Sequence, residues 1–365
     1  MELKETRIAE GWKLELMDSG RPLSWGSVVD CRMRIGSAVI DVGGIGGVGT
    51  LQEFRRKGYS RRVMEAALAL MQRERYSISF LHGIQDFYHR FGYLTCMPEH
   101  EFYLDTRDAE RAPAGAKTRK LRPGDLPSIA RLYNRDNAVR TGSVVRDPRH
   151  WPGFRKGTWW TFPAGVQVVV DARSRATGYV VYDQVEDCCR VAEVGGQGEE
   201  VFAAILHFLA QRAVKLRRER VWIDAPADHP FAIYCRQFGL RLHSLYPRNE
   251  RSMGRIIDFP RCMQRILPEL ARRWGSEERN KTLCIRTDLG EGTLGWKEGR
   301  LVLEGKLERG SVQLRQQHLI QLLMGYVRPS DLAGLGLIKL PRDRSGLVER
   351  LFPMQEAQLW WPDRF

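Results

Sequence analysis

Apolar and polar positions follow two periods in the N-terminal part of the chain. Residues 12–17 (WKLELM) alternate as a half-buried strand does, and residues 27–35 and 38–42 are two more extended segments joined by a tight Gly36-Ser37 turn. From Tyr59 the period lengthens, because apolar side chains recur three and four positions apart, as on one buried face of a helix: Val63, Ala66, Ala67, Leu70 and Met71. With strands at 77–81 and 101–104 and a short helical stretch at 86–90, residues 1–105 are predicted to form one α/β unit.

The segment between these strands and the helix has a clear chemical character. A glycine-rich extended stretch leads into the helix through basic residues and a glycine: Arg55, Arg56, Lys57, Gly58 and Arg61. Free backbone N–H groups and the helix dipole favour an anion at such a helix start, and guanidinium groups add charge-assisted hydrogen bonds. A glycine also lets the backbone approach the ligand closely. The sequence therefore predicts an anion site at this turn.

A second stretch repeats the same order of elements without the basic turn. A helix through Tyr133, strands at 166–171 and 178–183, a helix at 199–216 and a strand at 220–225 predict another α/β unit. We interpret residues 193–200 as the loop before its helix, and Glu199 and Glu200 at the helix start would repel an anion. Residues 106–118, with small and charged residues and no apolar period, are typical of a linker. The second unit is thus interpreted as a degenerate copy with a structural role.

The pattern changes again from Asp258 onward. It predicts a helix at 261–272, a hairpin with strands at 283–287 and 293–297, a strand at 312–314 and a helix at 316–324. The ending is apolar, with Trp360 and Trp361 shortly before Phe365, whereas frayed tails are usually polar. The expected domains are residues 1–112, 118–257 and 258–365.

Composition narrows the functional classes. No apolar run approaches the length of a membrane span and the N-terminus lacks a signal-peptide pattern, so no membrane association is expected. The seven cysteines are scattered without a C-x-x-C motif, which indicates reduced thiols in a cytoplasmic protein and no metal site. The net charge of +14 raises the question of nucleic acid, but the basic residues are spread along the chain without a nucleic-acid-binding signature. We therefore expect no nucleic-acid partner.

Two motifs compete for the anion site. Gly44-x-Gly46-x-x-Gly49 matches a dinucleotide fingerprint, but there the helix would begin within the glycines, whereas here it begins after Gly58. Arg55-x-x-Gly58-x-Ser60 resembles the pyrophosphate loop of the GNAT acetyltransferases, whose last position is Gly or Ala. Ser60 departs from that pattern but is still small. We favour the second interpretation.

A second motif lies downstream at the matching distance. Residues 87–93 (FYHRFGY) resemble the FY-x-x-x-GF/Y signature of GNAT enzymes, in which the tyrosine of the first pair protonates the leaving thiolate. That resemblance assigns the general-acid role to Tyr88. The alternative is that these aromatic side chains only pack in the core.

The whole order, two GNAT units followed by a sterol-carrier-like domain, is similar to the enhanced intracellular survival (Eis) acetyltransferases. The resemblance implies an α/β (α+β) fold with mixed sheets, acetyl-CoA bound by the first unit, a primary amine as acceptor and a homo-oligomer, a hexamer in relatives. It implies roles for these residues: backbone groups of Val48 and Thr50 toward the pantetheine; Arg55, Arg56, Lys57, Gly58, Ser60 and Arg61 around the pyrophosphate; Tyr88 as acid; and the α-carboxylate of Phe365 as base.

The sequence departs from the family pattern in two places. The family's first unit opens with two helices beside the acceptor pocket, and the stretch before the anion loop is too short for them. Arg364 also brings a cation next to a pocket for cationic amines, although Asp363 could offset it.

Three functions follow from these observations. The first is acetyl transfer from acetyl-CoA to a primary amine by direct attack; Cys96 could suggest an acyl-enzyme, but no histidine is placed to activate it. The second is a carrier of hydrophobic ligands that uses the C-terminal domain. The third is a CoA-binding regulator without catalysis.

Overall fold

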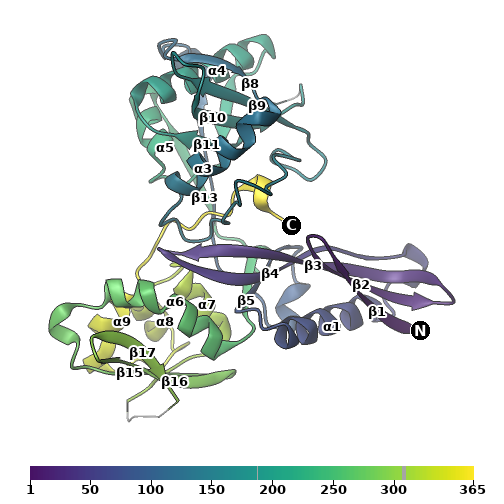
Figure 1. Ribbon diagram of the computed structural model, residues 1–365, viewed down its shortest axis with the longest axis vertical. Coiled ribbons are helices and arrows are strands. Elements are labelled where there is room, and N and C mark those ends of the chain that lie inside the picture. Colours follow the sequence, from purple (N-terminus) through teal and green to yellow (C-terminus); the bar gives the residue numbers. More distant parts are fainter. Residues whose placement is uncertain (187, 306–309) are drawn as a thin grey trace.

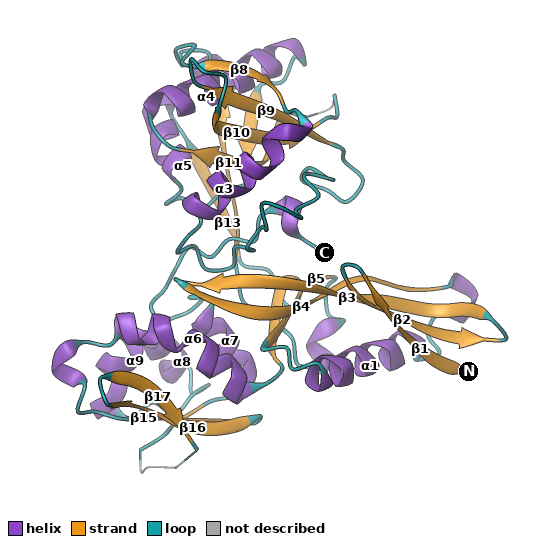
Figure 2. Cartoon of the chain, viewed as in Figure 1, coloured by secondary structure: helices purple, strands orange, loops and turns teal. Residues whose placement is uncertain are grey.

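The computed structural model describes residues 1–186, 188–305 and 310–365. Two seven-stranded sheets and one four-stranded sheet organise this part of the chain. Figure 1 shows the second α/β unit at the top, the first sheet running across the middle with α1 below it, and the C-terminal domain at the lower left. Each body combines strands with covering helices (Figure 2), so the expected mixed α/β fold is confirmed.

The first sheet has the order β1-β2-β3-β4-β5-β14-β6. Its strands from the N-terminal unit are β1 (Glu2–Ile8), β2 (Gly11–Asp18), β3 (Arg21–Ile35), β4 (Ala38–Thr50), β5 (Ile78–Gly83) and β6 (Leu94–Thr95). The chain opens with strands where the family pattern has two helices. The first helix is α1 (Tyr59–Arg73), preceded by the single turn η1 (Gln52–Phe54). Its start at Tyr59 is the predicted one, and four of the five predicted apolar positions are buried.

The two faces of the first sheet are covered by different elements. On one face, Leu14, Val28 and Ile45 pack with Met64 and Leu70 of α1 in one cluster. On the other face, a second cluster joins sheet residues to the C-terminal domain, with α6 (Phe259–Arg273) as the nearest helix: Met33, Ile40, Val42, Ile78 and Phe80 meet Met263, Ile266 and Leu270. The first unit is therefore held between α1 and the C-terminal domain.

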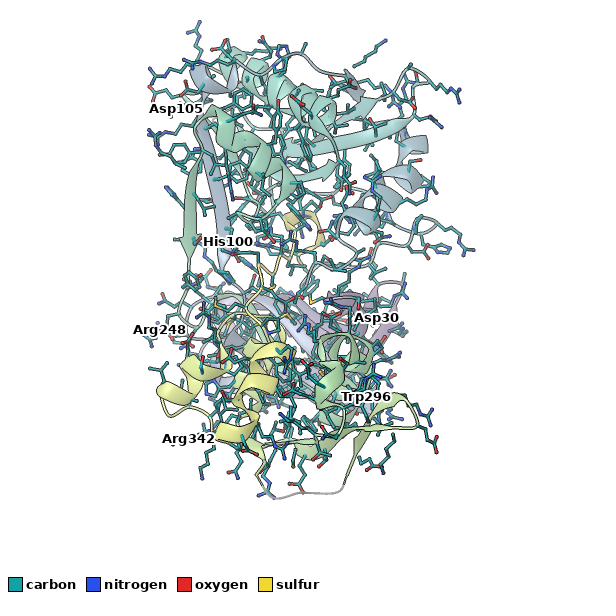
Figure 3. The ribbon with its side chains drawn as sticks, turned by 90° about the vertical axis from the view of Figure 1, so that its left-hand side faces the viewer. Asp30, His100, Asp105, Arg248, Trp296 and Arg342 are labelled. Atoms are coloured by element: carbon teal, nitrogen blue, oxygen red, sulfur yellow. The ribbon has the colours of Figure 1, made fainter. Side chains whose placement is uncertain are left out.

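The first and second units exchange strands. We expected the strand near residues 101–104 in the first unit, but β7 (Glu99–Asp105) pairs with β12 and β13 in the second sheet. In return, β14 (Arg251–Ile256) lies between β5 and β6 of the first sheet. Figure 3 shows His100 near the middle of the molecule and Asp105 toward the far end of the second unit. A division at residue 112 or 257 thus separates paired strands, and the domain limits stay predictions.

The second sheet has the order β13-β7-β12-β11-β10-β9-β8. The elements of the second unit are α2 (Thr106–Ala109), β8 (Lys117–Lys120), η3 (Pro123–Asp125), α3 (Leu126–Asp136), β9 (Ala164–Val170), β10 (Ala176–Asp183), β11 (Arg190–Gly196), α4 (Glu199–Lys215), β12 (Arg220–Ile223), α5 (Pro230–Cys235), η4 (Arg236–Phe238) and β13 (Arg241–Leu245).

Two predictions for this unit were wrong. Part of the segment interpreted as a linker packs into the domain, because Ala109 and Ala112 are buried in the same cluster as the apolar residues of α4. The stretch interpreted as a loop before α4 is largely the strand β11, which pairs antiparallel with β10 and parallel with β12. Its alternating apolar positions are interrupted by Glu193, a buried carboxylate whose partner lies far away in the sequence.

The C-terminal domain combines a four-stranded sheet with helices. After α6 come η5 (Ser276–Glu278), β15 (Leu283–Thr287), β16 (Gly290–Lys297), β17 (Arg300–Glu304), β18 (Val312–Gln313), α7 (Gln316–Leu323), α8 (Pro329–Gly334), η6 (Arg342–Arg344), α9 (Ser345–Leu351) and η7 (Trp361–Asp363). The predicted helices and hairpin are present, and β17 was missed. The last residues leave this domain and run to the second unit, where Trp360 and Trp361 join its core.

Two further observations concern the whole described chain. No helix in the described ranges has the length and apolar character needed to cross a membrane. Within the described residues no disulfide links the cysteines, and no group of three or more His, Cys, Asp or Glu side chains could hold a metal ion.

Candidate active site

The central feature of the first sheet is the point where β4 and β5 part. The two strands run parallel and pair from Val42–Ile78 to Ile45–Leu81, after which their pairing ends. β4 continues to Thr50 and stays paired with β3 on its other side. The edge of β4 beyond Ile45 therefore has backbone N–H and C=O groups that β5 no longer pairs, and such groups need another partner when they are buried.

A β-bulge in β4 coincides with this opening. Trp25 faces Gly49 and Ser27 faces Gly46, so Gly47 and Val48 together oppose the single residue Gly26. Gly47 has φ +59, a left-handed conformation that glycine adopts without strain. Bulges bend a strand and redirect its groups, and this one includes Val48, one of the two residues expected to offer backbone groups to the pantetheine.

The start of α1 carries the predicted basic turn. Gly58 is the N-cap with φ +78, and a Cβ built on it would meet nothing within 4 Å. The left-handed conformation explains the glycine, and the open space leaves the first N–H groups of α1 accessible. Among the described residues, Arg55, Arg56 and Arg61 have no carboxylate partner. These free cations at a helix N-terminus provide the charge of an anion site.

A cleft brings the two sequence motifs together. It has a volume of about 380 Å³ and is lined by Thr50, Phe54, Arg55, Arg56, Gly58, Tyr59, Ser60, Arg61, Phe87, Arg90 and Phe91. Six predicted cofactor residues line it. The other two do not: Val48 lies in the bulge, and the Lys57 ammonium lies 4.9 Å from the centre of the Phe54 ring. Phe87 and Phe91 from the second motif form the far side, beside Tyr88.

Tyr88 lies at the end of β5. It begins η2 (Tyr88–Phe91), and a Cβ on Gly83 would come within 2.9 Å of its ring, so the small residue makes room for the phenol. The ring contacts Phe87 at 4.8 Å between centroids and Tyr93 at 6.3 Å. Burial raises the pKa of Tyr88, because the phenolate would lose its hydration. The hydroxyl therefore stays protonated at neutral pH, as a proton donor must.

Phe365 lies against β4 near the same opening, on the face of the sheet that the C-terminal domain covers, whereas Tyr88 belongs to the cluster on the α1 face. A Cβ on Gly44 would come within 2.6 Å of its ring, and a Cβ on Gly46 would come within 2.9 Å of its carboxyl carbon. The last pair between the two strands is Ile45–Leu81. Gly46 follows Ile45 in β4, and Gly83 lies two residues after Leu81 in β5. The two glycines therefore admit Phe365 and Tyr88 to neighbouring strands where those strands separate.

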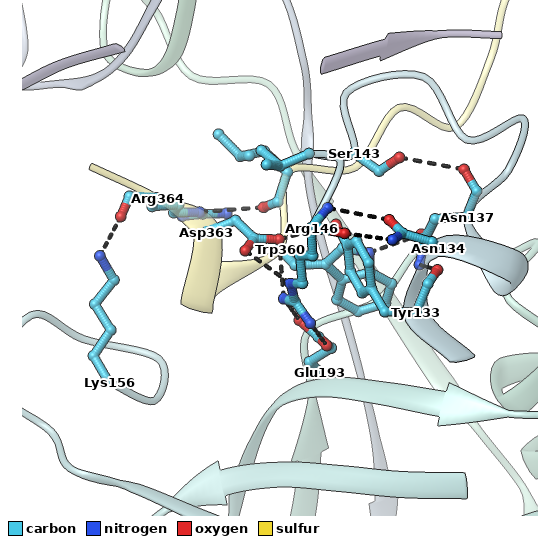
Figure 4. A network of polar contacts seen from close by, with 12 residues as sticks. Tyr133, Asn134, Asn137, Ser143, Arg146, Lys156, Glu193, Trp360, Asp363 and Arg364 are labelled. Carbon is cyan, nitrogen blue, oxygen red and sulfur yellow. Dashed lines mark hydrogen bonds and ion pairs between the residues drawn. The ribbon is translucent and has the colours of Figure 1, made fainter. Parts of the chain in front are cut away.

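A buried ionic network holds the segment that leads to Phe365 (Figure 4). Arg146 donates to both oxygens of Glu193, at 2.7 and 2.5 Å, and to both oxygens of Asp363, at 3.0 and 2.9 Å. Tyr133 and Tyr179 donate to Asp363 and Glu193 respectively, at 2.9 and 2.6 Å. We call Arg146, Glu193 and Asp363 the tail network. It attaches the C-terminal segment to β11 of the second unit.

The tail network lies in an aromatic and largely dry environment. The Arg146 guanidinium carbon is 3.6 Å from the centre of the Tyr133 ring and 4.5 Å from that of Trp151. The two carboxylates raise the pKa of Arg146 well above its ordinary value, although burial opposes them. Trp360, fully buried three residues before Asp363, donates its indole N–H to Asn137 at 3.0 Å. Buried bidentate pairs of this kind fix geometry.

Arg364, next to Phe365, does not leave an uncompensated charge. Its guanidinium donates to Glu99 at 2.6 Å and lies 3.9 Å from the Trp361 ring. We expected Asp363 to offset it, but Asp363 pairs with Arg146 instead. The Arg364 cation also contributes, after burial, to the low pKa of His82, about 3, so that His82 is neutral at pH 7.

Sequence reasoning missed the tail network and the contact partners of Arg364. Arg146, Glu193 and Asp363 lie in three separate segments, and no spacing links them. The only signal was a glutamate within the apolar run of 190–196, since a charge on a buried strand needs a partner. His229 has a structural role, because its side chain caps α5 by accepting a hydrogen bond from the N–H of Phe231.

Comparison with known proteins agrees with this arrangement. Residues 1–96 match the acetyltransferase (GNAT) domain family, and residues 270–360 match the sterol carrier protein domain family. No curated protein matched the chain by sequence.

Solved structures match over nearly the whole chain. A GCN5-related N-acetyltransferase from Kribbella flavida has 16% identity and a TM-score of 0.71, covering 97% of this chain and 87% of that one. One from Anabaena variabilis ATCC 29413 has 15% identity and a TM-score of 0.75, with coverages of 94% and 88%. Eis1 from Mycobacterium abscessus has 16% identity and a TM-score of 0.65, with coverages of 98% and 92%.

At these identities the structural likeness shows the fold, while the two domain families identify the parts. The chain therefore contains a GNAT acetyltransferase domain and a sterol carrier protein domain, and it shares its overall fold with Eis1.

Proposed function

We propose that this protein transfers an acetyl group from acetyl-CoA to a primary amine by direct attack, with Tyr88 as general acid and the α-carboxylate of Phe365 as general base. The observation that supports this most strongly is the position of Phe365, whose carboxyl carbon lies against Gly46 where β4 leaves β5. Tyr88 lies against Gly83 across the same opening.

The turn before α1 fits the diphosphate of acetyl-CoA. Three guanidinium groups without carboxylate partners in the described chain, from Arg55, Arg56 and Arg61, line the cleft of about 380 Å³ with Ser60. Lys57 adds a fourth cation beside Phe54. Val48 and Thr50 would offer backbone groups to the pantetheine, and the lost pairing beyond Ile45 supports this role. When bound, acetyl-CoA supplies the reactive thioester.

The two catalytic groups move one proton each. The Phe365 carboxylate takes a proton from the incoming ammonium, because an amine attacks a carbonyl carbon only when its lone pair is free. The Tyr88 hydroxyl gives a proton to the departing thiolate sulfur. The raised pKa of Tyr88 keeps that proton available. Cys96 is buried and its pKa is raised, which argues against a thiolate nucleophile and an acyl-enzyme.

The alternatives find less support in the described chain. The apolar cavity between the sheet and helices of the C-terminal domain, bounded by Leu283, Val312 and Phe352 among others, has a volume of about 10 Å³. That is less than a bound lipid chain needs, so a carrier function would require the domain to open. A CoA-binding regulator without catalysis would leave the placement of Tyr88 and Phe365 without a purpose.

Compartment and assembly remain part of the proposal. Cysteines without a disulfide among the described residues suit a reducing compartment, and we expect the protein in the cytoplasm. A homo-hexamer follows only from the family resemblance, and sedimentation would measure it.

A thiol-release assay tests the proposed activity. Purified protein is mixed with acetyl-CoA and a panel of primary amines, and the free thiol and the N-acetylated amine are both measured. We expect equimolar amounts of the two products with at least one amine. Acetyl-CoA binding by calorimetry without thiol release over the whole panel would instead support the regulator.

A further inference from the structure

A loop of the second unit, residues 151–163, reaches the C-terminal segment. It presents two adjacent tryptophans, Trp159 and Trp160, that are 49% and 40% exposed. Their rings lie 6.0 and 6.2 Å from the ring of Trp361, and the His82 ring of β5 lies 6.2 Å from that of Trp160. Two exposed indoles side by side form an apolar surface that folding alone does not explain.

This loop also brings an ammonium group to the end of the chain. Lys156 donates to the backbone carbonyl of Arg364, the residue before Phe365, as Figure 4 shows. Its Nζ lies 4.0 Å from the centre of the Trp160 ring. Lys156 has no carboxylate partner among the described residues. Burial lowers the pKa of Lys156 to about 8, which leaves the group mostly protonated at pH 7.

The charges around the proposed base can be followed one by one. Arg364 pairs with Glu99, Asp363 shares the Arg146 guanidinium with Glu193, and His82 is neutral at pH 7. The Phe365 carboxylate and the Lys156 ammonium remain, and neither pairs with an oppositely charged side chain of the described residues. A substrate with a single ammonium group would find one carboxylate to accept its proton, whereas each additional positive charge would meet Lys156.

We propose that the acceptor is a monoamine whose primary amino group is attached to a flat aromatic body, and that Trp159, Trp160 and Lys156 select it against polyamines. The inference rests on the proposed acetyl transfer and names the substrate class for that same site. The indole faces supply area for stacking and attract one ammonium group. Lys156 supplies the repulsion that specificity against polycations requires.

Three amines test the selection in the wild-type protein. 2-Phenylethylamine carries an aromatic ring and one charge, propylamine has the charge without the ring, and spermidine has several charges. We expect kcat/KM for 2-phenylethylamine to exceed that for either of the others by at least about 10-fold, since one stacked ring contributes on the scale of a hot-spot contact. A higher kcat/KM for spermidine would overturn the proposal while leaving acetyl transfer intact.

Variants assign the effect to the residues. Trp160→Ala should raise KM for 2-phenylethylamine by about 10-fold. It should thereby lower the ratio of kcat/KM for 2-phenylethylamine to kcat/KM for propylamine. Lys156→Met should raise kcat/KM for spermidine relative to 2-phenylethylamine. The controls are Tyr246→Ala, an exposed aromatic residue outside this loop, and Lys120→Met on β8, which should leave both ratios as in the wild type. Unchanged ratios in Trp160→Ala and Lys156→Met would overturn the proposal.

A binding measurement separates this inference from the catalytic one. Quenching of tryptophan fluorescence by 2-phenylethylamine does not depend on turnover. We expect saturable quenching in the wild type that is lost in the double variant Trp159→Ala, Trp160→Ala. Saturable quenching without acetylation would overturn the proposed function but support the site. Acetylation without quenching would support the proposed function but overturn the site.

Discussion

The first and second α/β units differ at the start of the helix that follows a central strand. In the first, β4 leads through a basic turn to α1, where Gly58 leaves the helix start open and the neighbouring arginines have no carboxylate partner in the described chain. In the second, β11 leads to α4, whose first turn carries Glu199 and Glu200. One helix start suits an anion and the other repels it.

The preceding strands differ in a complementary way. β4 has glycines at 44 and 46 that make room for Phe365, whereas β11 has Glu193, which pairs with Arg146 and through it with Asp363. Both strands therefore hold the same C-terminal segment. β4 contacts Phe365, and β11 is linked through Arg146 to Asp363, two residues earlier in the chain. The comparison shows that the second unit, whose helix start is acidic, holds the segment that carries the proposed catalytic end of the chain.

Removing the phenol should have the largest effect on turnover and should separate the two units. Tyr88→Phe is expected to lower kcat by about 100-fold or more, because the leaving thiolate loses its proton donor, with little change in KM for acetyl-CoA. Tyr234 lies in α5 of the second unit and outside the cleft, and Tyr234→Phe is the control. Steady-state kinetics of both variants measure the difference. Equal losses would remove the distinction between the units.

Breaking the tail network should reveal the anchoring role of the second unit. Arg146→Met leaves Glu193 and Asp363 buried without their partner, so the free energy of unfolding should fall by about 3–5 kcal/mol. Arg119→Met, which breaks the more accessible pair with Asp125, should cost about 1 kcal/mol or less. Urea unfolding measures both.

A milder change distinguishes anchoring from general stability. Asp363→Asn keeps the shape of the side chain and removes only its charge. If the network positions Phe365, kcat should fall while KM for acetyl-CoA and the cooperative unfolding transition persist. A variant that lost cofactor binding together with kcat would speak for a global structural role instead.

Changing one helix start at a time should test the difference in charge. Arg55→Ala is expected to weaken acetyl-CoA binding by about 10-fold, as the loss of one charge-assisted hydrogen bond does. Glu199→Ala at the start of α4 should leave binding as in the wild type. Calorimetry with CoA at two salt concentrations measures both, and the Arg55 effect should shrink at high salt. Equal affinities in the two variants would contradict the assignment.

The attachment of the first unit to the C-terminal domain should respond to acid. Glu269 of α6 accepts hydrogen bonds from Ser37 in the β3–β4 turn and from Arg272 and Arg273. These partners outweigh burial and lower the pKa of Glu269 to about 2. Because its folded-state pKa lies below the ordinary value, the stabilisation is present above about pH 4.5 and is lost as the pH falls toward 2.

The corresponding variant measures the contribution of this carboxylate. Glu269→Gln should lower the free energy of unfolding by about 2 kcal/mol at pH 7, and the difference from wild type should shrink below pH 4.5. Glu65→Gln on the exposed face of α1 is the control. A difference that stays constant down to pH 2.5 would show that the carboxylate charge does not matter.

The sequence predicted local features well and long-range ones poorly. The start of α1 at Tyr59 and the helix α4 followed from periodicity, and the cleft does bring the basic turn near the aromatic motif. The exchange of β7 and β14 between sheets was not predictable, because strand pairing depends on partners far away in the chain. For the same reason Glu193 stayed within a supposed loop: its buried charge makes sense only with Arg146.

The central claim is that the α-carboxylate of Phe365 is the base, held in place by the second unit. Its most direct test is an extension of the chain by Gly-Ser after Phe365, compared with the same extension before Met1, in a thiol-release assay with saturating acetyl-CoA. We predict that the C-terminal extension lowers kcat by at least about 100-fold while KM for acetyl-CoA stays the same, and that the N-terminal extension has no effect. Wild-type turnover by the C-terminally extended chain would contradict the account.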